Sequence, residues 1–195
     1  MFPRFIRLGV ETILKMLCEK IIIKNILIVN KKDKFNGIID ELYIKAESII
    51  FNKINISNIN IKIKDIILKF PFNKNNLFTD KSHAKINIRL TKDNINKTLL
   101  NKKWKSLKKS IESYISMRFN SIEINNKSIY FISLDGLSNN KINYNLQYDK
   151  NNISLVNNIN HKKLLILNDN NITVKKLFFY ESYIEIELIS KIIFN

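Results

Sequence analysis

Apolar residues recur along this chain with two different periods. They alternate with polar residues around 42–46, 54–70 and 84–90, and again in short runs between 122 and 188. Successive side chains of a strand point to opposite faces, so this alternation predicts half-buried strands. The alternation changes phase at Ser57-Asn58, which predicts a bulge that bends the sheet.

Between Thr91 and Ile115 the apolar residues recur every third or fourth position, which predicts an amphipathic helix. Thr91 or Asp93 can cap its first turn, because a side-chain oxygen there can accept from a free N–H group. A continuous helix would be about 37 Å long at about 1.5 Å per residue, enough to cross a small domain. Asn101-Lys102 could instead divide it into two helices.

Residues 1–24 show the same helical spacing, with charged residues at four-residue intervals on the other face. Such a helix either packs on its own domain or lies in a membrane interface, and its mixed charges favour packing. Charges at Arg7, Glu11 and Lys15 interrupt the apolar core that a cleavable signal peptide needs. No apolar run is long enough to span a membrane. We therefore expect a cytoplasmic or peripheral membrane protein.

The order of these segments predicts an α+β fold with an antiparallel sheet, because the connections are too short for helical crossovers. At 195 residues the chain suits a single domain over 1–195. Within it, 1–24 would form an N-terminal amphipathic helix and 26–195 a β-rich part.

The charge of the chain is strongly positive and unevenly distributed. The formal net charge is +16, and residues 81–110 hold ten Lys or Arg residues against one acid, Asp93. Such a cluster predicts an anionic partner, either lipid headgroups or nucleic acid. A solvated basic helix face without any ligand is the plain alternative.

Catalytic and cofactor motifs are missing from the sequence. With three glycines far apart, no phosphate-binding glycine loop can be written. His83 and His161 have no second ligand at metal-binding spacing, so no metal site is predicted. Cys18 cannot form an internal disulfide, and its spacing places it near the border of the apolar face of the first helix, where we expect it to pack. Glu185 and Glu187 share a strand face and give only a weak hint of an acid pair. We expect a non-enzymatic protein without metal or cofactor.

Two blocks of the chain resemble motifs of a known family. Residues Phe35–Phe51 and Ile54–Ile61 are similar to the pattern Gly, apolar, Leu, Ala-acid, Gly or polar, Leu-x-Leu-Ser-x-Leu-x-Leu. Residues Ile88–Asn96 resemble Leu-Thr-Glu-x-Asp-Leu-Asn, and Leu99–Leu107 resembles the helix that follows it. These patterns are found in the LmeA-like phospholipid-binding domain family of actinobacteria and cyanobacteria. The resemblance extends over about 35–190.

The resemblance implies a curved antiparallel sheet wrapped around a long central helix, as in tubular lipid-binding folds, with an apolar groove for acyl chains. Apolar residues at suitable positions would line this groove: Ile111, Ile115, Tyr130, Phe131, Leu134, Phe178 and Phe179. Basic residues of the helix would receive a phosphate headgroup or contact an anionic surface: Lys102, Lys105, Lys108 and Lys109. These residues are chosen by position, and a closed core is the plain interpretation of the same aromatic side chains.

The sequence thus predicts non-catalytic binding of anionic phospholipid, or of another acyl-chain lipid, with a membrane surface as partner. Lipid that co-purifies with the protein should lie between the helix Ile95–Ile115 and the concave face of the sheet. The alternatives are a nucleic-acid-binding module that uses the basic helix, or a structural protein without ligand. Few Arg residues, and Trp104 as the only aromatic residue within the basic cluster, argue against nucleic acid. The sequence sets neither the lipid nor the oligomeric state.

Overall fold

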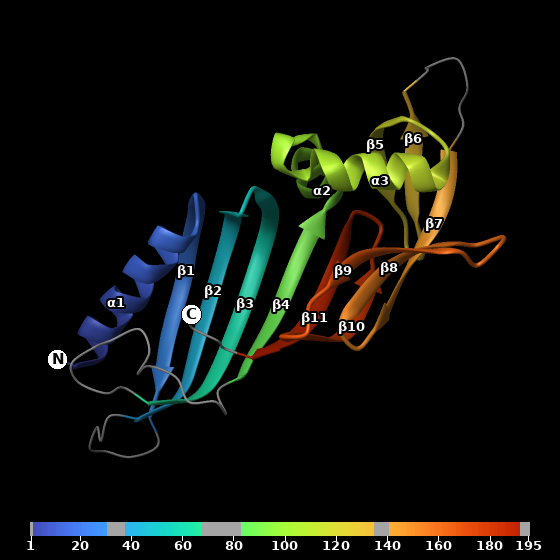
Figure 1. Cartoon of the computed structure of the whole chain (residues 1–195). Helices are drawn as coiled ribbons and strands as arrows, with labels where there is room; N and C mark the ends of the chain where they lie inside the picture. Colours follow the sequence, from blue (N-terminus) through green and yellow to red (C-terminus); the bar gives the residue numbers. More distant parts are fainter. Residues whose placement is uncertain (1, 31–37, 68–82, 135–140, 192–195) are drawn as a thin grey trace.

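The computed structural model describes residues 2–30, 38–67, 83–134 and 141–191. Its elements form two antiparallel sheets with helices at the beginning and in the middle of the chain (Figure 1). The α+β class with antiparallel sheets is therefore confirmed. Parts of the predicted motifs and strands, at 35–37 and 68–70, lie outside the described residues.

Sheet A has six strands in the order β1-β2-β3-β4-β11-β10 and is curled (Figure 1). Its strands are β1 (Lys20–Val29), β2 (Ile38–Phe51), β3 (Ile54–Ile67), β4 (His83–Thr91), β10 (Ile172–Phe179) and β11 (Tyr183–Lys191). Sheet B has five strands in sequence order: β5 (Phe119–Ile124), β6 (Ile129–Ser133), β7 (Lys141–Asp149), β8 (Asn152–Asn157) and β9 (Lys163–Asn168). The helical segments of the middle of the chain (residues 92–115) and sheet B are inserted between β4 and the two strands that complete sheet A.

One face of sheet A is apolar from edge to edge. The strand registers place one row of apolar side chains across all six strands: Ile26, Ile44, Ile61, Ile86, Leu188 and Val174. The helix α1 (Phe2–Leu17) covers this face near β1 and β2 with Ile6, Val10 and Leu14. Sheet B covers it at the other end, where Ile153 packs against Val174 and Leu188. Burial of the apolar side chains at these two ends stabilises sheet A.

The predicted long central helix is wrong. The segment forms α2 (Lys92–Leu100), a 3₁₀ turn η2 (Lys102–Trp104) and α3 (Lys105–Ile115), so the alternative break at Asn101-Lys102 is the observed one. Asn101 has extended backbone angles, φ −71° and ψ 138°, and its side chain accepts from the N–H of Lys103. This cap starts a new helical segment in a new direction, and neither of the two described sheets wraps around the pieces (Figure 1).

The N-terminal helix is shorter than the predicted 1–24. α1 ends at Leu17, and the chain turns into β1 at Lys20, before residue 26, where the β-rich part was expected to begin. Residues 21–23 are three isoleucines, whose branched side chains favour an extended backbone over a helix. Apolar spacing alone did not separate the end of α1 from the start of β1, because the docked face of α1 and the face of β1 that it covers are both apolar.

The phase change in β3 has its counterpart in β2. Ser48 has φ 50°, a left-handed conformation, and lies between the pairs Glu47↔Asn58 and Ile49↔Ile56. Both strands change phase at the same level, so Ala46 and Ile49 both contribute to one buried cluster and the register does not shift. The predicted bulge in β3 alone is thus a paired irregularity of the hairpin.

Candidate functional site

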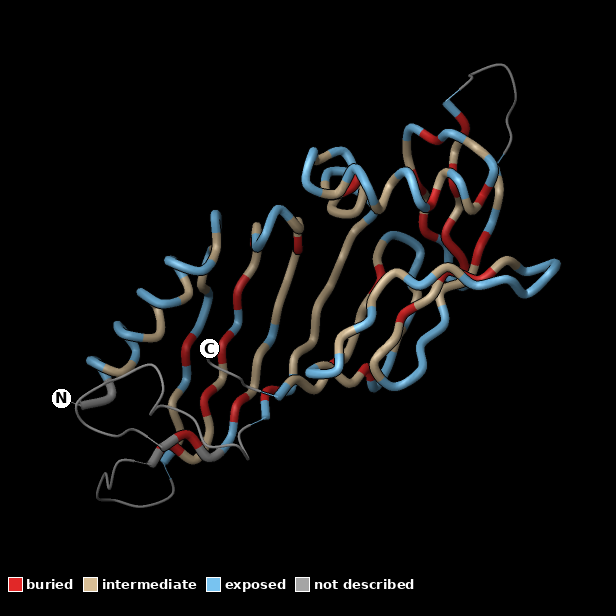
Figure 2. The backbone as a smooth tube through the Cα atoms, viewed as in Figure 1, coloured by how far each residue is buried: buried red, intermediate tan, exposed pale blue. Residues whose placement is uncertain are grey.

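Three of the predicted groove residues are part of a closed core. Ile111 and Ile115 of α3 and Phe131 of β6 are 4%, 4% and 2% exposed and belong to the cluster between α3 and sheet B. Phe119 contacts Phe131 edge to face, with ring centroids 4.9 Å apart. Figure 2 shows this concentration of buried backbone in α3 and sheet B. These side chains occupy the space that the predicted groove required.

The other four predicted groove residues are separated from that core and from one another. Phe179 is partly buried at the margin of the same cluster, whereas Leu134 at the end of β6 is exposed. Phe178 is exposed and paired with Glu185 across β10 and β11, on the face of sheet A opposite to its apolar one. Tyr130 lines an open pocket on sheet B. The structure does not bring the seven residues together.

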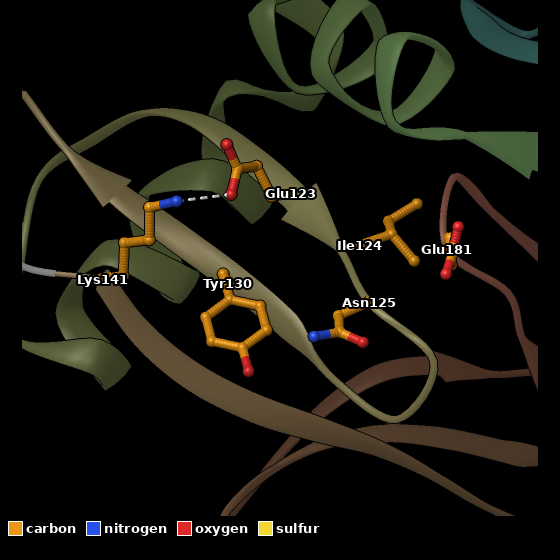
Figure 3. Close-up of a pocket in the computed structure, with 6 residues that line it drawn as sticks. All are labelled: Glu123, Ile124, Asn125, Tyr130, Lys141 and Glu181. Carbon is orange, nitrogen blue, oxygen red and sulfur yellow. Dashed lines mark hydrogen bonds and ion pairs between the residues drawn. The ribbon is translucent and has the colours of Figure 1, made fainter.

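The pocket at Tyr130 is polar and shallow. It has a volume of about 360 Å³ and is lined by Glu123, Ile124, Asn125, Tyr130, Lys141 and Glu181 (Figure 3). Lys141 forms an ion pair with Glu123 over 2.8 Å, so the two opposite charges satisfy each other. Among the described residues, no group of three His, Cys, Asp or Glu side chains could hold a metal ion. Four of its six lining residues are polar or charged, and Ile124 and the Tyr130 ring are its apolar part.

The predicted headgroup lysines fall into two groups. Lys102, Lys105 and Lys109 are exposed and form no ion pair with any residue that the structure describes. Lys108 is partly buried, pairs with Glu112 over 3.8 Å and lies 5.1 Å from the centroid of the Phe119 ring. The ammonium group of Lys108 is therefore engaged within α3, and Lys102, Lys105 and Lys109 are open to an anion.

Lys102 belongs to a surface that was not predicted, at the end of sheet A where α1 ends, β2 turns into β3 and α2 ends. We call this surface the lysine rim and define it by its residues: Met16, Leu17, Lys20, Phe51, Lys53, Leu100, Lys102, Lys103 and Trp104. Four of its apolar side chains are between 46% and 79% exposed: Met16, Leu17, Phe51 and Leu100. Its four lysines are exposed as well. Exposed apolar groups and lysines therefore occur together at one end of the sheet.

Hydrogen bonds hold the three segments of the rim together. The N–H of Glu19 donates to the carbonyl of Ile50 over 2.8 Å, which ties the start of β1 to β2. The indole Nε1 of Trp104 donates to the carbonyl of Asn52 over 3.3 Å, and the Lys103 ammonium donates to the Asn52 side chain. The rim is therefore one assembled surface, although its parts are far apart in the sequence.

The turn at the centre of the rim has an unusual residue for its conformation. Asn52 and Lys53 both have positive φ, 52° and 65°, in a two-residue loop between the paired residues Phe51 and Ile54. Such loops favour Asn followed by Gly, because a side chain at the second position is strained. Here Glu19 offsets the strain: it accepts from the Lys53 N–H over 3.1 Å and from the Lys53 ammonium over 2.8 Å.

The same contact sets the charge of the rim. The hydrogen bond from Lys53 holds the pKa of Glu19 below its ordinary value, so this carboxylate is ionised at neutral pH and neutralises one lysine. Lys20 and Lys102 form no ion pair with the described residues. The rim therefore keeps a net positive charge beside its exposed apolar groups.

The sequence carried a signal for this surface that the periodicity analysis passed over. Leu100 fits the apolar spacing of the predicted continuous helix, yet it is exposed at the last position of α2, next to the break at Asn101. Phe51-Asn52-Lys53-Ile54 reads as a two-residue hairpin loop with an apolar and a basic residue at its tip. Cys18 was predicted to pack, and it does so, partly buried against the cluster of Ala46 and Ile49.

In comparisons with known proteins, no protein-family model, no curated protein and no solved structure matches this chain. No helix within the described ranges is long and apolar enough to cross a membrane.

Proposed function

We propose that the protein binds anionic phospholipid at a membrane surface without turning it over, and that the lysine rim is the contact. The observation that carries this proposal is the arrangement of the rim. Four exposed apolar side chains lie among four lysines at one end of sheet A, on segments joined by hydrogen bonds. An exposed apolar patch bordered by cations is typical of a surface that meets lipid headgroups and the adjoining acyl chains.

The energies are of the right order for reversible recruitment. Each lysine near an anionic membrane contributes about 1 kcal/mol, so the unpaired Lys20 and Lys102 together with Lys103 give weak binding. Apolar side chains such as Met16 and Leu100 add to it when they leave water. The stems of the lysines can pack on the same apolar surface while their ammonium groups reach the phosphates.

A second apolar surface adjoins the rim and supports binding of an acyl chain there. In the middle of sheet A, between the part covered by α1 and the part covered by sheet B, four isoleucines are only partly buried: Ile59, Ile61, Ile86 and Ile88. They continue the apolar face toward the rim, because Ile54 and Leu90 join the cluster of Ile59 and Ile88. This supports a chain-binding surface on sheet A in place of the predicted groove beside α3.

Flotation with vesicles tests the proposal. Vesicles with increasing phosphatidylglycerol content would be mixed with the full chain at about 0.1 M and about 1 M NaCl, where the screening lengths are about 10 Å and 3 Å. We expect binding to rise with anionic content and to fall at high salt. Equal binding to neutral vesicles, or no binding to anionic ones, contradicts the proposal.

The matched variants locate the contact. Lys20→Gln/Lys102→Gln removes two of the three rim lysines that form no ion pair with the described residues, and we expect weaker binding to the anionic vesicles. Lys162→Gln/Lys163→Gln removes the same charge from two exposed positions at the beginning of β9 and should bind like the unmodified protein. Equal losses in both variants would mean that net charge alone governs binding and that the rim is not the site.

Nucleic acid is the competing partner, and one observation favours it. The rings of Tyr180 and Tyr183 are stacked with centroids 4.4 Å apart, and the Arg89 guanidinium lies 4.3 Å from the Tyr183 centroid. A base can stack on such a platform. Trp104, in contrast, is partly buried with its N–H bonded to Asn52. Tight, salt-sensitive gel shifts that disappear in Tyr180→Ala would favour nucleic acid over lipid. Binding of neither lipid nor nucleic acid would favour a structural protein.

A further inference from the structure

The helix α1 has an apolar side that faces away from the protein. Its side chains fall into three arcs around the helix axis at about 100° per residue. Ile6, Val10 and Leu14 form the arc that is docked on sheet A. The other two arcs remain outside that interface.

The second arc is charged and mostly basic: Arg4, Arg7, Glu11 and Lys15. Its one acid is neutralised within the helix, because Glu11 pairs with Lys15 over 2.7 Å. This ion pair holds the pKa of Glu11 below its ordinary value, so the carboxylate and the ammonium stay paired at neutral pH. Arg4 and Arg7 form no ion pair with the described residues, and this arc presents a net positive charge.

The third arc, which we call the outer arc, consists of Phe5, Leu8, Gly9, Ile13 and Met16, with Thr12 among them. Phe5 and Leu8 are 68% and 60% exposed, and Met16 is 79% exposed. A Cβ added at Gly9 would meet no atom within 4 Å, so no residue that the structure describes covers the middle of this arc. The Thr12 hydroxyl donates to the carbonyl of Leu8 over 2.9 Å, so it adds little polarity to the surface.

We propose that the outer arc inserts among the acyl chains of an anionic bilayer, with α1 lying along the membrane surface while its opposite side stays docked on sheet A. This inference rests on the proposed function. A helix that is apolar on two sides and charged on the third needs a second apolar partner. Arg4 and Lys15 lie on the side of the charged arc next to Leu8 of the outer arc, and a basic border of this kind is typical of helices that lie in the interface of anionic membranes.

The outer arc is continuous with the lysine rim. Met16 belongs to both, and Leu17 and Lys20 follow directly along the chain. In Figure 1 the length of α1, the β2–β3 turn and α2 lie along one margin of the molecule, the upper left. One membrane surface can therefore contact the outer arc and the rim together. The two predictions made for this segment, packing on the domain and lying in an interface, are then compatible.

A fluorescent probe on the outer arc tests this inference. Phe5→Cys would be labelled with the polarity-sensitive dye NBD in a chain whose native thiol is removed by Cys18→Ala. The vesicles would contain equal parts of phosphatidylglycerol and phosphatidylcholine. We expect the NBD emission to shift to the blue and to be quenched by nitroxides placed on the lipid chains. Ile159→Cys is the matched control, because Ile159 is also apolar and exposed but lies in the β8–β9 turn, and its probe should not respond.

Binding measurements separate this inference from the proposed function. Phe5→Ser/Leu8→Ser should weaken binding to these vesicles about tenfold or more, and should remove the part of the binding that resists about 1 M NaCl. Ile159→Ser should not. If the protein binds the vesicles through the rim but the Phe5 probe stays in water and Phe5→Ser/Leu8→Ser binds normally, the insertion of α1 is wrong and the proposed function stands.

Two further outcomes overturn the inference. If the unmodified protein binds no anionic vesicle, the proposed function fails and the insertion of α1 fails with it. If the Phe5 probe shifts to the blue without vesicles as the protein concentration rises, the partner of the outer arc is a second copy of the chain. Circular dichroism of each variant would show whether α1 and the sheets are still folded.

Discussion

The backbone N–H of Asn55, the second residue of β3, donates to the hydroxyl oxygen of Thr98 in α2 over 2.9 Å. The Thr98 hydroxyl in turn donates to the carbonyl of Asn94 over 2.8 Å. One side chain therefore fixes α2 to the strand that leaves the lysine rim. The position of Leu100 and of the rim lysines of η2 depends on this link.

Replacing Thr98 tests how strongly α2 is attached. Thr98→Val keeps the shape of the side chain but leaves the N–H of Asn55 without its acceptor in a partly buried place. We expect the free energy of unfolding to fall by about 1–2 kcal/mol, measured by urea denaturation. Thr98→Ser keeps the hydroxyl and should lose less. Equal losses in the two variants would show that the methyl group, and not the hydrogen bond, holds α2.

The first turn of α2 gives a second prediction. Thr91 accepts from the N–H of Asn94 over 3.2 Å, and the Asn94 side chain accepts from the N–H of Thr91 over 3.0 Å, which forms a capping box. Thr91→Ala should lower the free energy of unfolding by about 1 kcal/mol. Thr91→Ser should retain most of that stability in the same urea experiment. A neutral Thr91→Ala would mean that tertiary contacts alone hold the helix start.

Glu41 gives a prediction on pH dependence. The Tyr43 hydroxyl and the Lys62 ammonium donate to its carboxylate, and together they lower its pKa from 4.5 to about 2. A carboxyl group with a lowered pKa in the folded state stabilises the fold above its unfolded pKa, and this contribution is lost as the pH falls. The relevant window is therefore between 4.5 and about 2.

Thermal melts of the unmodified protein and of Glu41→Gln across that window are the measurement. We expect the unmodified protein to melt higher at neutral pH, and the difference to shrink as the pH falls through the window. Tyr43→Phe removes the largest cause of the shift and should move the loss of stability to higher pH. A difference between the two proteins that does not change with pH would contradict the assignment to Glu41.

Ile111 decides between a groove and a core at α3. It is 4% exposed and packs in the same cluster as Phe119 and Phe131. We expect Ile111→Ala to cost about 2–5 kcal/mol, as for other buried aliphatic residues, and Ile111→Glu to unfold the domain. Leu100→Glu, at an exposed position of the neighbouring helix, should change stability little. A folded Ile111→Glu variant that loses co-purified lipid in native mass spectrometry would show that the predicted groove exists.

The sequence predicted the strands well because one face of sheet A is buried by helix or sheet over most of its width. Every second residue of β4, from Ala84 to Leu90, faces that apolar side, so alternation and structure agree. Thr91 and Asp93 were the two predicted caps of the helix, because the first turn of a helix needs a local acceptor, and the cap in the structure is Thr91. Local rules succeed where local chemistry decides the conformation.

The prediction of one long helix was wrong, and the predicted groove residues are dispersed, for a different reason. The stripe from Ile95 to Ile115 is helical on both sides of Asn101, and periodicity cannot show that the two pieces point in different directions. The groove residues were chosen on the assumption of one sheet around one helix. Two sheets divide them, so Ile111 is in a core and Phe178 is on the opposite, polar face of sheet A. The rim needed the positions of three distant segments, which no single stretch of sequence contains.

The pairing of β4 with β11 has a consequence for synthesis of the protein. Roughly half of the chain lies between these neighbouring strands, from Thr91↔Tyr183 to His83↔Lys191. A ribosome therefore releases α1 and the first four strands long before the strands that complete their sheet exist. During that interval an apolar sheet edge is open in the cell, and pairing over such a separation is slow. We expect the nascent protein to rely on chaperones at this stage, and a product that stops before β11 to aggregate.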